Sequence, residues 1–127
     1  MIVADTDVLI DYLGGVEPGA SHVTEGIEAA SLYTTSVTRF ELLSGARTPR
    51  QRAVILDVLA LVRTLPISAR EADLAADVRH NLDRAGASIG MADSLIAGIA
   101  LAHGGRLLTH NRKHFERVSG LRLIVPE

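Results

Sequence analysis

The chain has 127 residues, a formal net charge of −2 and no cysteine. This length needs only one hydrophobic core, so we expect a single domain over residues 1–127. Without cysteine, disulfide frameworks and thiolate metal sites are excluded, and any bound metal must be held by oxygen or imidazole ligands. The near-balanced charge excludes a polycation that coats nucleic acid, which leaves such contacts to local basic clusters.

No segment has the length and composition of a membrane span. The most apolar helical stretch, Met91–His103, is too short to cross a bilayer and contains Asp93. The N-terminus lacks the basic start and the long apolar run of a secretory signal. We therefore expect a soluble, cytoplasmic protein, and the lack of cysteine fits that compartment.

Short apolar runs alternate with amphipathic stretches along the chain. The apolar runs predict strands at Ile2–Asp5, Ser31–Thr35, Leu65–Ile67, Arg106–Thr109 and Leu121–Ile124. The amphipathic stretches predict helices at Val8–Leu13, Ala20–Ala29, Val37–Gly45, Pro49–Arg63, Ala69–Arg84 and Met91–His103. Strands that alternate with helices need crossover connections, which predicts an α/β fold. We expect a sandwich with a mostly parallel sheet of four to five strands, covered by helices on both faces.

The first acidic residues follow the first predicted strand directly. Asp5 ends that strand, so its side chain should stand at the rim of the sheet, where α/β proteins bind ligands. On this observation alone a functional and a structural role are both open for Asp5. Asp7 is expected to cap the following helix by accepting backbone N–H bonds. Asp11, one helical turn further, is expected to be solvated.

Glu41 belongs to the helix predicted after the second strand. Its apolar stripe includes Val37 and Phe40, so helical spacing places Glu41 beside the stripe and facing inward. An inward carboxylate needs a partner. A structural ion pair with Arg39 or Arg47 would provide one, and a functional site is the alternative.

Asp93 is the only formally charged residue between Arg84 and Arg106. The surrounding segment is apolar on all sides, which is typical of a buried helix. A carboxylate in such a helix must be neutralised, capped or coordinated. Its place in the first turn also allows a structural role as a cap or a favourable contact with the helix dipole.

The three acids Asp5, Glu41 and Asp93 attach to different elements that a parallel sheet can bring to one edge. Uncompensated carboxylates about 4 Å apart repel by about 4 kcal/mol at an intermediate dielectric, so a cation is needed to offset the repulsion. Because the ligands are all oxygen, Mg²⁺ fits best, with Mn²⁺ as a substitute. Such an ion activates water and stabilises charge on phosphorus, which predicts hydrolysis of phosphodiester bonds.

Four stretches carry a family resemblance: IVADTDVLIDYL, TTSVTRFELLSGA, IGMADSLIAGIALAHGGRLLTHNRKHF and LRLIVPE. In this order, and over nearly the whole chain, they resemble the PIN-domain ribonucleases and in particular the VapC toxins of bacterial toxin–antitoxin pairs. The resemblance implies that the metal ligands and catalytic acids are Asp5, Glu41 and Asp93.

The resemblance also assigns residues around these acids. Thr6 and Thr109 match hydroxyl positions that line the pocket of the family. The family often has a fourth acid in the loop after the fourth strand, where this chain has Asn111. An amide can hydrogen-bond a metal-bound water but brings no charge, and Asn111 can equally cap the short helix that follows.

The resemblance further implies a Mg²⁺-dependent endoribonuclease that acts on tRNA, rRNA or mRNA. It implies a homodimer, and inhibition by a VapB-type antitoxin whose C-terminal segment occupies the acidic pocket. Because an acidic pocket repels RNA, we expect phosphate contacts from Arg112, Lys113 and Arg117, unless these residues are merely solvated surface. A second basic cluster is formed by Arg47, Arg50 and Arg52.

Three other functions remain open on the sequence. A haloacid-dehalogenase-like phosphatase shares the DTDV opening, but it needs a supporting lysine and a later acidic pair, and Lys113 is the only lysine. A phospho-acceptor receiver domain should carry an aspartate at the end of its central strand, and the predicted strand Leu65–Ile67 has none. A catalytically silent module that binds RNA or a protein partner is compatible with Asn111 in place of an acid.

Overall fold

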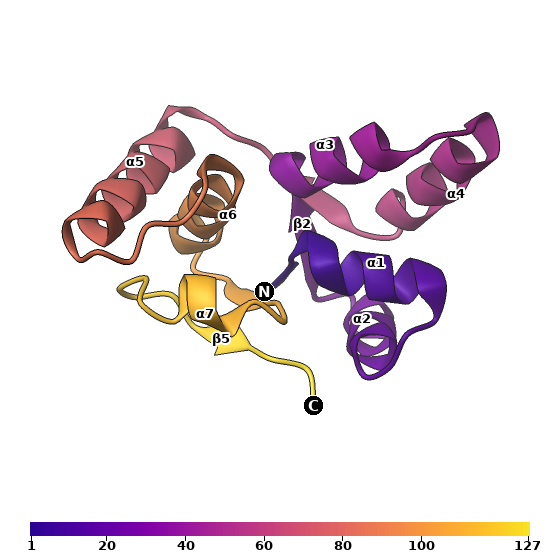
Figure 1. Ribbon diagram of the computed structural model, residues 1–127. Coiled ribbons are helices and arrows are strands. Elements are labelled where there is room, and N and C mark those ends of the chain that lie inside the picture. Colours follow the sequence, from indigo (N-terminus) through magenta and orange to yellow (C-terminus); the bar gives the residue numbers. More distant parts are fainter.

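The computed structural model describes all 127 residues as an α/β/α sandwich around a five-stranded sheet (Figure 1). The strands are β1 (Ile2–Ala4), β2 (Leu32–Thr35), β3 (Arg63–Leu65), β4 (Arg106–Leu108) and β5 (Leu123–Ile124). They lie in the order β3-β2-β1-β4-β5, and every neighbouring pair is parallel. The fold class predicted from the sequence is confirmed.

Seven helices flank the sheet. They are α1 (Thr6–Gly14), α2 (Gly19–Glu28), α3 (Ser36–Gly45), α4 (Pro49–Leu59), α5 (Ala69–Arg84), α6 (Met91–Ala102) and α7 (Arg112–Phe115). Helices α5 and α6 lie on one side of the sheet, and α1, α2 and α4 lie on the other (Figure 1). No helix combines the length and the apolar character that a bilayer crossing requires.

Alternating side chains on β1 and β4, two of the three inner strands, build a core on each face of the sheet. On β1, Val3 joins the core beneath α5 and α6, whereas Ala4 joins the core beneath α1 and α2. On β4, Leu107 and Leu108 divide in the same way. Both strands are therefore buried on both faces, which explains why they consist of continuous apolar runs.

The largest difference from the sequence prediction lies around β3. Helix α4 begins at Pro49 as predicted but ends at Leu59, and the strand occupies Arg63–Leu65 instead of Leu65–Ile67. Pro66 lacks an N–H for a strand ladder, so the pairing with β2 forms before it. The other predicted elements lie within two residues of the observed bounds.

The strand order reverses between β1 and β4. From β1 the chain builds outward through β2 and β3, then returns to place β4 on the other side of β1. The carboxyl ends of strands at such a reversal form the ligand-binding crevice of open α/β sheets. Asp5 follows β1 directly and Thr109 follows β4 directly, so both residues lie at this crevice.

The topology also corrects the reasoning about a receiver domain. The central strand is β1, which ends beside Asp5, and not the strand around Leu65. The central strand therefore does lead into an acid. The receiver is instead excluded by strand order, because receiver domains have the order 2-1-3-4-5.

Candidate active site

Asp5 lies at the centre of the crevice and is only 5% exposed. Its Oδ1 accepts a hydrogen bond from the backbone N–H of Thr6 at 2.7 Å, which caps the N-terminus of α1. Its Oδ2 accepts the hydroxyl of Thr109 at 2.8 Å. The prediction that Asp7 caps this helix is wrong, because α1 begins at Thr6 and the capping residue is Asp5.

Asp7 is a second carboxylate beside Asp5. Its Oδ2 accepts the backbone N–H of His110 at 3.0 Å and lies 3.3 Å from the hydroxyl oxygen of Thr109. The single hydroxyl hydrogen of Thr109 cannot serve Asp5 and Asp7 at the same time. The Oδ1 of Asp7 is buried and has no hydrogen-bond partner. This pair of carboxylates therefore has fewer donors than buried anions normally require.

The charges of the site repel one another. Burial, followed by the charge of Asp7, raises the pKa of Asp5 from 3.8 to about 6, and the charge of Asp93 adds to the increase. Hydrogen bonds from Thr109 and Thr6 oppose it. Burial also raises the pKa of Asp7, against the hydrogen bond and charge of His110. Neither lysine nor arginine forms an ion pair with any of these acids.

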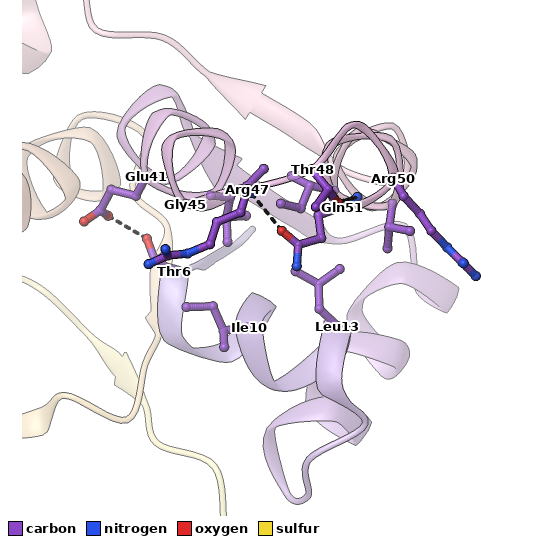
Figure 2. A pocket seen from close by; sticks show the side chains of 13 residues that line it. Thr6, Ile10, Leu13, Glu41, Gly45, Arg47, Thr48, Arg50 and Gln51 are labelled. Atoms are coloured by element: carbon purple, nitrogen blue, oxygen red, sulfur yellow. Dashed lines mark hydrogen bonds between the residues drawn. The ribbon is translucent and has the colours of Figure 1, made fainter.

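Glu41 reaches the site from α3 through Thr6. The hydroxyl of Thr6 donates to Oε1 of Glu41 at 2.7 Å (Figure 2), and the hydroxyl oxygen of Thr38 lies 3.0 Å from that of Thr6. The backbone N–H of Thr6 donates to Asp5. Thr6 therefore links the first acid of the site, Asp5, to the second, Glu41. The hydroxyl of Thr6 thus orients the carboxylate of Glu41. This contact is consistent with the expectation that Thr6 lines the pocket.

The predicted orientation of Glu41 is wrong. Glu41 is exposed, and its supposed neighbour in an apolar stripe, Phe40, is 70% exposed. The buried face of α3 is formed by Val37, Thr38 and Leu42 instead. Neither of the arginines proposed as partners makes an ion pair with Glu41.

Asp93 lies in the first turn of α6 and contacts His114, which the sequence indicated only as a neighbour of Arg112 and Lys113. Its Oδ2 is 2.6 Å from Nδ1 of His114 on α7, and the side-chain nitrogen of Asn111 is 2.8 Å from the same Nδ1. Asn111 occupies the N-cap position before α7, but its side chain makes no capping bond. Its backbone N–H donates to the Thr109 hydroxyl oxygen at 3.0 Å.

Asp11 is not free in solvent, contrary to the prediction. Its Oδ2 lies 2.6 Å from Nε2 of His110. Together with the bond from the His110 backbone to Asp7, this contact fastens the loop after β4 to α1. The two contacts keep Thr109 and Asn111 close to the end of β1.

The three basic residues expected to contact RNA are exposed. Arg112 and Lys113 follow Asn111 in α7, and Arg117 lies one turn further. Arg112 pairs with Glu116 at 3.3 Å, whereas Lys113 and Arg117 form no ion pair. None of the three forms an ion pair with Asp5, Asp7, Glu41 or Asp93, and Arg117 borders a hollow against α5.

The donor set fits a hydrated divalent cation. No three Asp, Glu or His side chains converge closely enough to enclose an ion by themselves. Mg²⁺ keeps several waters and commonly uses one or two carboxylates, so a closed ligand cage is not required. The unpartnered oxygen of Asp7 and the mutual repulsion of Asp5, Asp7 and Asp93 are the features that such a charge would compensate.

A groove of about 620 Å³ leads away from Thr6 and Glu41, between α1, α3 and α4 (Figure 2). Figure 2 shows the side chain of Arg47 reaching back toward Thr6, whereas Arg50 points away from it at the opposite end, and neither arginine forms an ion pair. The groove also contains apolar side chains, among them Ile10 and Val54, which are 55% and 47% exposed. The groove thus combines the acid Glu41 with apolar side chains and two unpaired arginines. The sequence indicated Thr6 and Glu41 as site residues and Arg47 and Arg50 as part of a basic cluster.

Comparisons with known proteins agree with this geometry. The sequence pattern of the family described as "PIN domain" matches residues 2–121. The tRNA(fMet)-specific endonuclease VapC of Shigella flexneri is 31% identical over 122 residues, which cover 93% of this chain and 92% of that protein. Ribonuclease VapC10 of Mycobacterium tuberculosis is 34% identical over 115 residues, which cover 91% and 86%.

A solved structure has the same fold. The DNA-bound VapBC complex of Salmonella typhimurium contains a chain that matches with a TM-score of 0.86 at 25% identity. The match covers 98% of this chain and 96% of that chain. The arrangement of strands and helices around the crevice is therefore shared over essentially the full length of both proteins.

Proposed function

Because this chain belongs to the PIN-domain family, and within it to the VapC group, we propose that it is a toxin that hydrolyses phosphodiester bonds inside RNA. The observation that carries the proposal is the group of carboxylates at the strand-order reversal, where Asp5 is buried without a basic partner. The endonuclease and ribonuclease names of the two relatives support it.

The proposal includes Mg²⁺, with Mn²⁺ as a substitute, held by Asp5, Glu41 and Asp93. Such an ion lowers the pKa of its bound water and stabilises the charge that develops on phosphorus. The unpartnered oxygen of Asp7 adds negative charge beside Asp5. Asn111, in the family's fourth position, would hydrogen-bond water near the scissile phosphate.

The hydroxyl groups of the site orient its acids. Thr6 donates to Glu41, and Thr109 donates to Asp5, so each carboxylate is held before any substrate arrives. Orientation of this kind reduces the reorganisation needed in the transition state. Arg112, Lys113 and Arg117 would contact RNA phosphates and offset the repulsion between RNA and the acids.

We also propose that a VapB-type antitoxin is the partner and that its inhibitory segment occupies the groove between α1, α3 and α4 (Figure 2). A peptide with an apolar face would cover Ile10 and Val54, while a cationic side chain at one end would pair with Glu41. An acidic side chain of the peptide would pair with Arg47 or Arg50. The homodimer is likewise a proposal, and light scattering of the purified protein tests it.

The nuclease proposal is tested by incubating purified protein with a structured RNA in Mg²⁺. We expect cleavage that EDTA abolishes and that Asp93→Asn abolishes. Glu25→Gln, which changes an exposed acid of α2 outside the site, should leave cleavage intact. Bound but intact RNA under every condition would support a catalytically silent binding module. Turnover of p-nitrophenyl phosphate without RNA cleavage would favour the phosphatase.

A further inference from the structure

The ring of His114 connects two residues of the candidate site. Its Nδ1 lies 2.6 Å from Oδ2 of Asp93 and 2.8 Å from the side-chain nitrogen of Asn111. The side chain of His114 is 48% exposed, whereas that of Asp93 is 23% exposed. A half-exposed ring thus lies against a more buried carboxylate.

The contact with Asp93 determines which ring nitrogen carries hydrogen. A carboxylate oxygen can only accept, so an N···O distance of 2.6 Å requires a hydrogen on Nδ1 of His114. Because Asp93 uses this single hydrogen, Nδ1 cannot also donate to Asn111, and the amide of Asn111 turns its oxygen toward the ring nitrogen, since its NH₂ group would face another donor. The two amide orientations differ by a half-turn, and the hydrogen-bond network selects between them.

This hydrogen bond is not needed to attach α7 to the protein. Phe115, the next residue, is fully buried in the core beneath α5 and α6, and Val118 is 4% exposed in the same core. The helix is therefore anchored by apolar contacts. The contact of His114 acts on Asp93 instead, because it occupies Oδ2, while Oδ1 of Asp93 makes no hydrogen bond within the protein.

We propose that His114 is a positioning residue that holds the Asp93 carboxylate in the orientation required to bind the divalent ion. The inference rests on the proposed function, because it takes Asp93 as a ligand of that ion. In this chain Asn111 brings no charge to the site. His114 instead fixes the orientation of an acid that is already there, Asp93. Outer hydrogen-bond partners of metal ligands typically contribute 10–100-fold to metal affinity.

The test is the affinity of the full chain for Mn²⁺ alone, measured by electron paramagnetic resonance. We expect His114→Ala to weaken Mn²⁺ binding by about 10–100-fold. His114→Asn should retain most of the affinity, because the asparagine amide nitrogen can occupy the position of Nδ1 and donate to Asp93. His114→Gln should resemble His114→Ala, since its longer side chain places the amide nitrogen near the position of Nε2. His80→Ala removes an exposed histidine of α5 and should change nothing.

Two results would overturn the inference. If His114→Ala binds Mn²⁺ as well as the wild type, or more tightly because the ring competes with the ion for Asp93, His114 does not position a ligand. If asparagine and glutamine behave alike, the geometry of the Nδ1 hydrogen bond is not the cause. A wild-type protein that fails to bind Mn²⁺ overturns the proposed function as well, whereas normal wild-type binding with unaffected variants overturns only the role of His114.

Discussion

Replacing Asp5 by asparagine should stabilise the metal-free protein. Burial and the neighbouring acids raise the pKa of Asp5 from 3.8 to about 6. One pKa unit corresponds to about 1.4 kcal/mol, so the ionised carboxylate lowers the free energy of unfolding by about 3 kcal/mol at pH values above 6. Asparagine removes the charge but keeps an oxygen that accepts the N–H of Thr6, and it is an equally good N-cap. An altered contact with Thr109 would cost about 1 kcal/mol, which leaves a net gain of about 2 kcal/mol.

The dependence on pH distinguishes this cause from a general packing effect. The folded state binds the Asp5 proton more tightly than the unfolded state does. The wild-type stability from this group is therefore fully present below pH 3.8, and it is lost as the pH rises through about 6. Asp5→Asn lacks this titration. The advantage of the variant should consequently be small at pH 4 and reach its full value near pH 7.5.

The assay is urea denaturation followed by circular dichroism, with EDTA present, at several pH values. Asp77→Asn is the matched control, because Asp77 is an exposed acid in the middle of α5, and the change should stay within about 0.5 kcal/mol. Added Mg²⁺ should stabilise the wild type but not Asp5→Asn. The reasoning is refuted if Asp5→Asn is no more stable than the wild type at pH 7.5, or if its advantage is equal at pH 4.

Other measurements probe separate contacts. Thr109→Val removes a fully buried hydroxyl that donates to Asp5, so the free energy of unfolding at pH 7.5 should fall by about 1–3 kcal/mol in the same urea assay. The hydroxyl of Ser68 helps to lower the pKa of Glu71 to about 2, so the wild type should lose stability as the pH falls from 4.5 toward 2. Glu71→Gln should lose less over that range in acid titrations. Lys113→Ala should weaken RNA binding and reduce its salt dependence by about one phosphate contact, as measured by filter binding at several salt concentrations.

The sequence predicted the parts of the site that depend on strands and on isolated charge. Asp5 follows an apolar strand, and Asp93 is the one charge in a long apolar segment, so both stood out without any knowledge of contacts. The parallel topology brings the ends of β1 and β4 to one edge, and the charge of Asp93 acts on Asp5 there, but no three acids form a closed cluster. The fold class was predictable for the same reason, since strands and helices alternate along the chain.

The orientation of α3 was not predictable from its pattern. Phe40 is apolar but points to solvent, and isolated exposed apolar side chains are common in folded proteins. Because Phe40 was assigned to the buried stripe, the predicted orientation of α3 was rotated about its axis, and Glu41 was expected to face inward. The true buried face includes Thr38, a polar residue whose hydroxyl group lies against Thr6.

The contacts that complete the site join residues far apart in the chain. His114 meets Asp93 across 21 positions, and His110 meets Asp11 across 99. No local spacing indicates such pairs: that of His110 and Asp11 arises from the side-by-side placement of β1 and β4, and that of His114 and Asp93 from the packing of α7 against α6. Asp5 caps α1 in place of Asp7 because the helix begins at Thr6, two residues before the predicted start.

The most direct measurement of the central claim is the position of the ion. Crystals soaked in Mn²⁺, at a concentration that supports RNA cleavage, should give an anomalous scattering peak within coordination distance of Asp5 and Asp93. The same soak of Asp5→Asn crystals should give no peak there. Efficient Mn²⁺-dependent cleavage with the ion bound elsewhere, or with no peak at these carboxylates, would contradict the assignment of this crevice as the metal site.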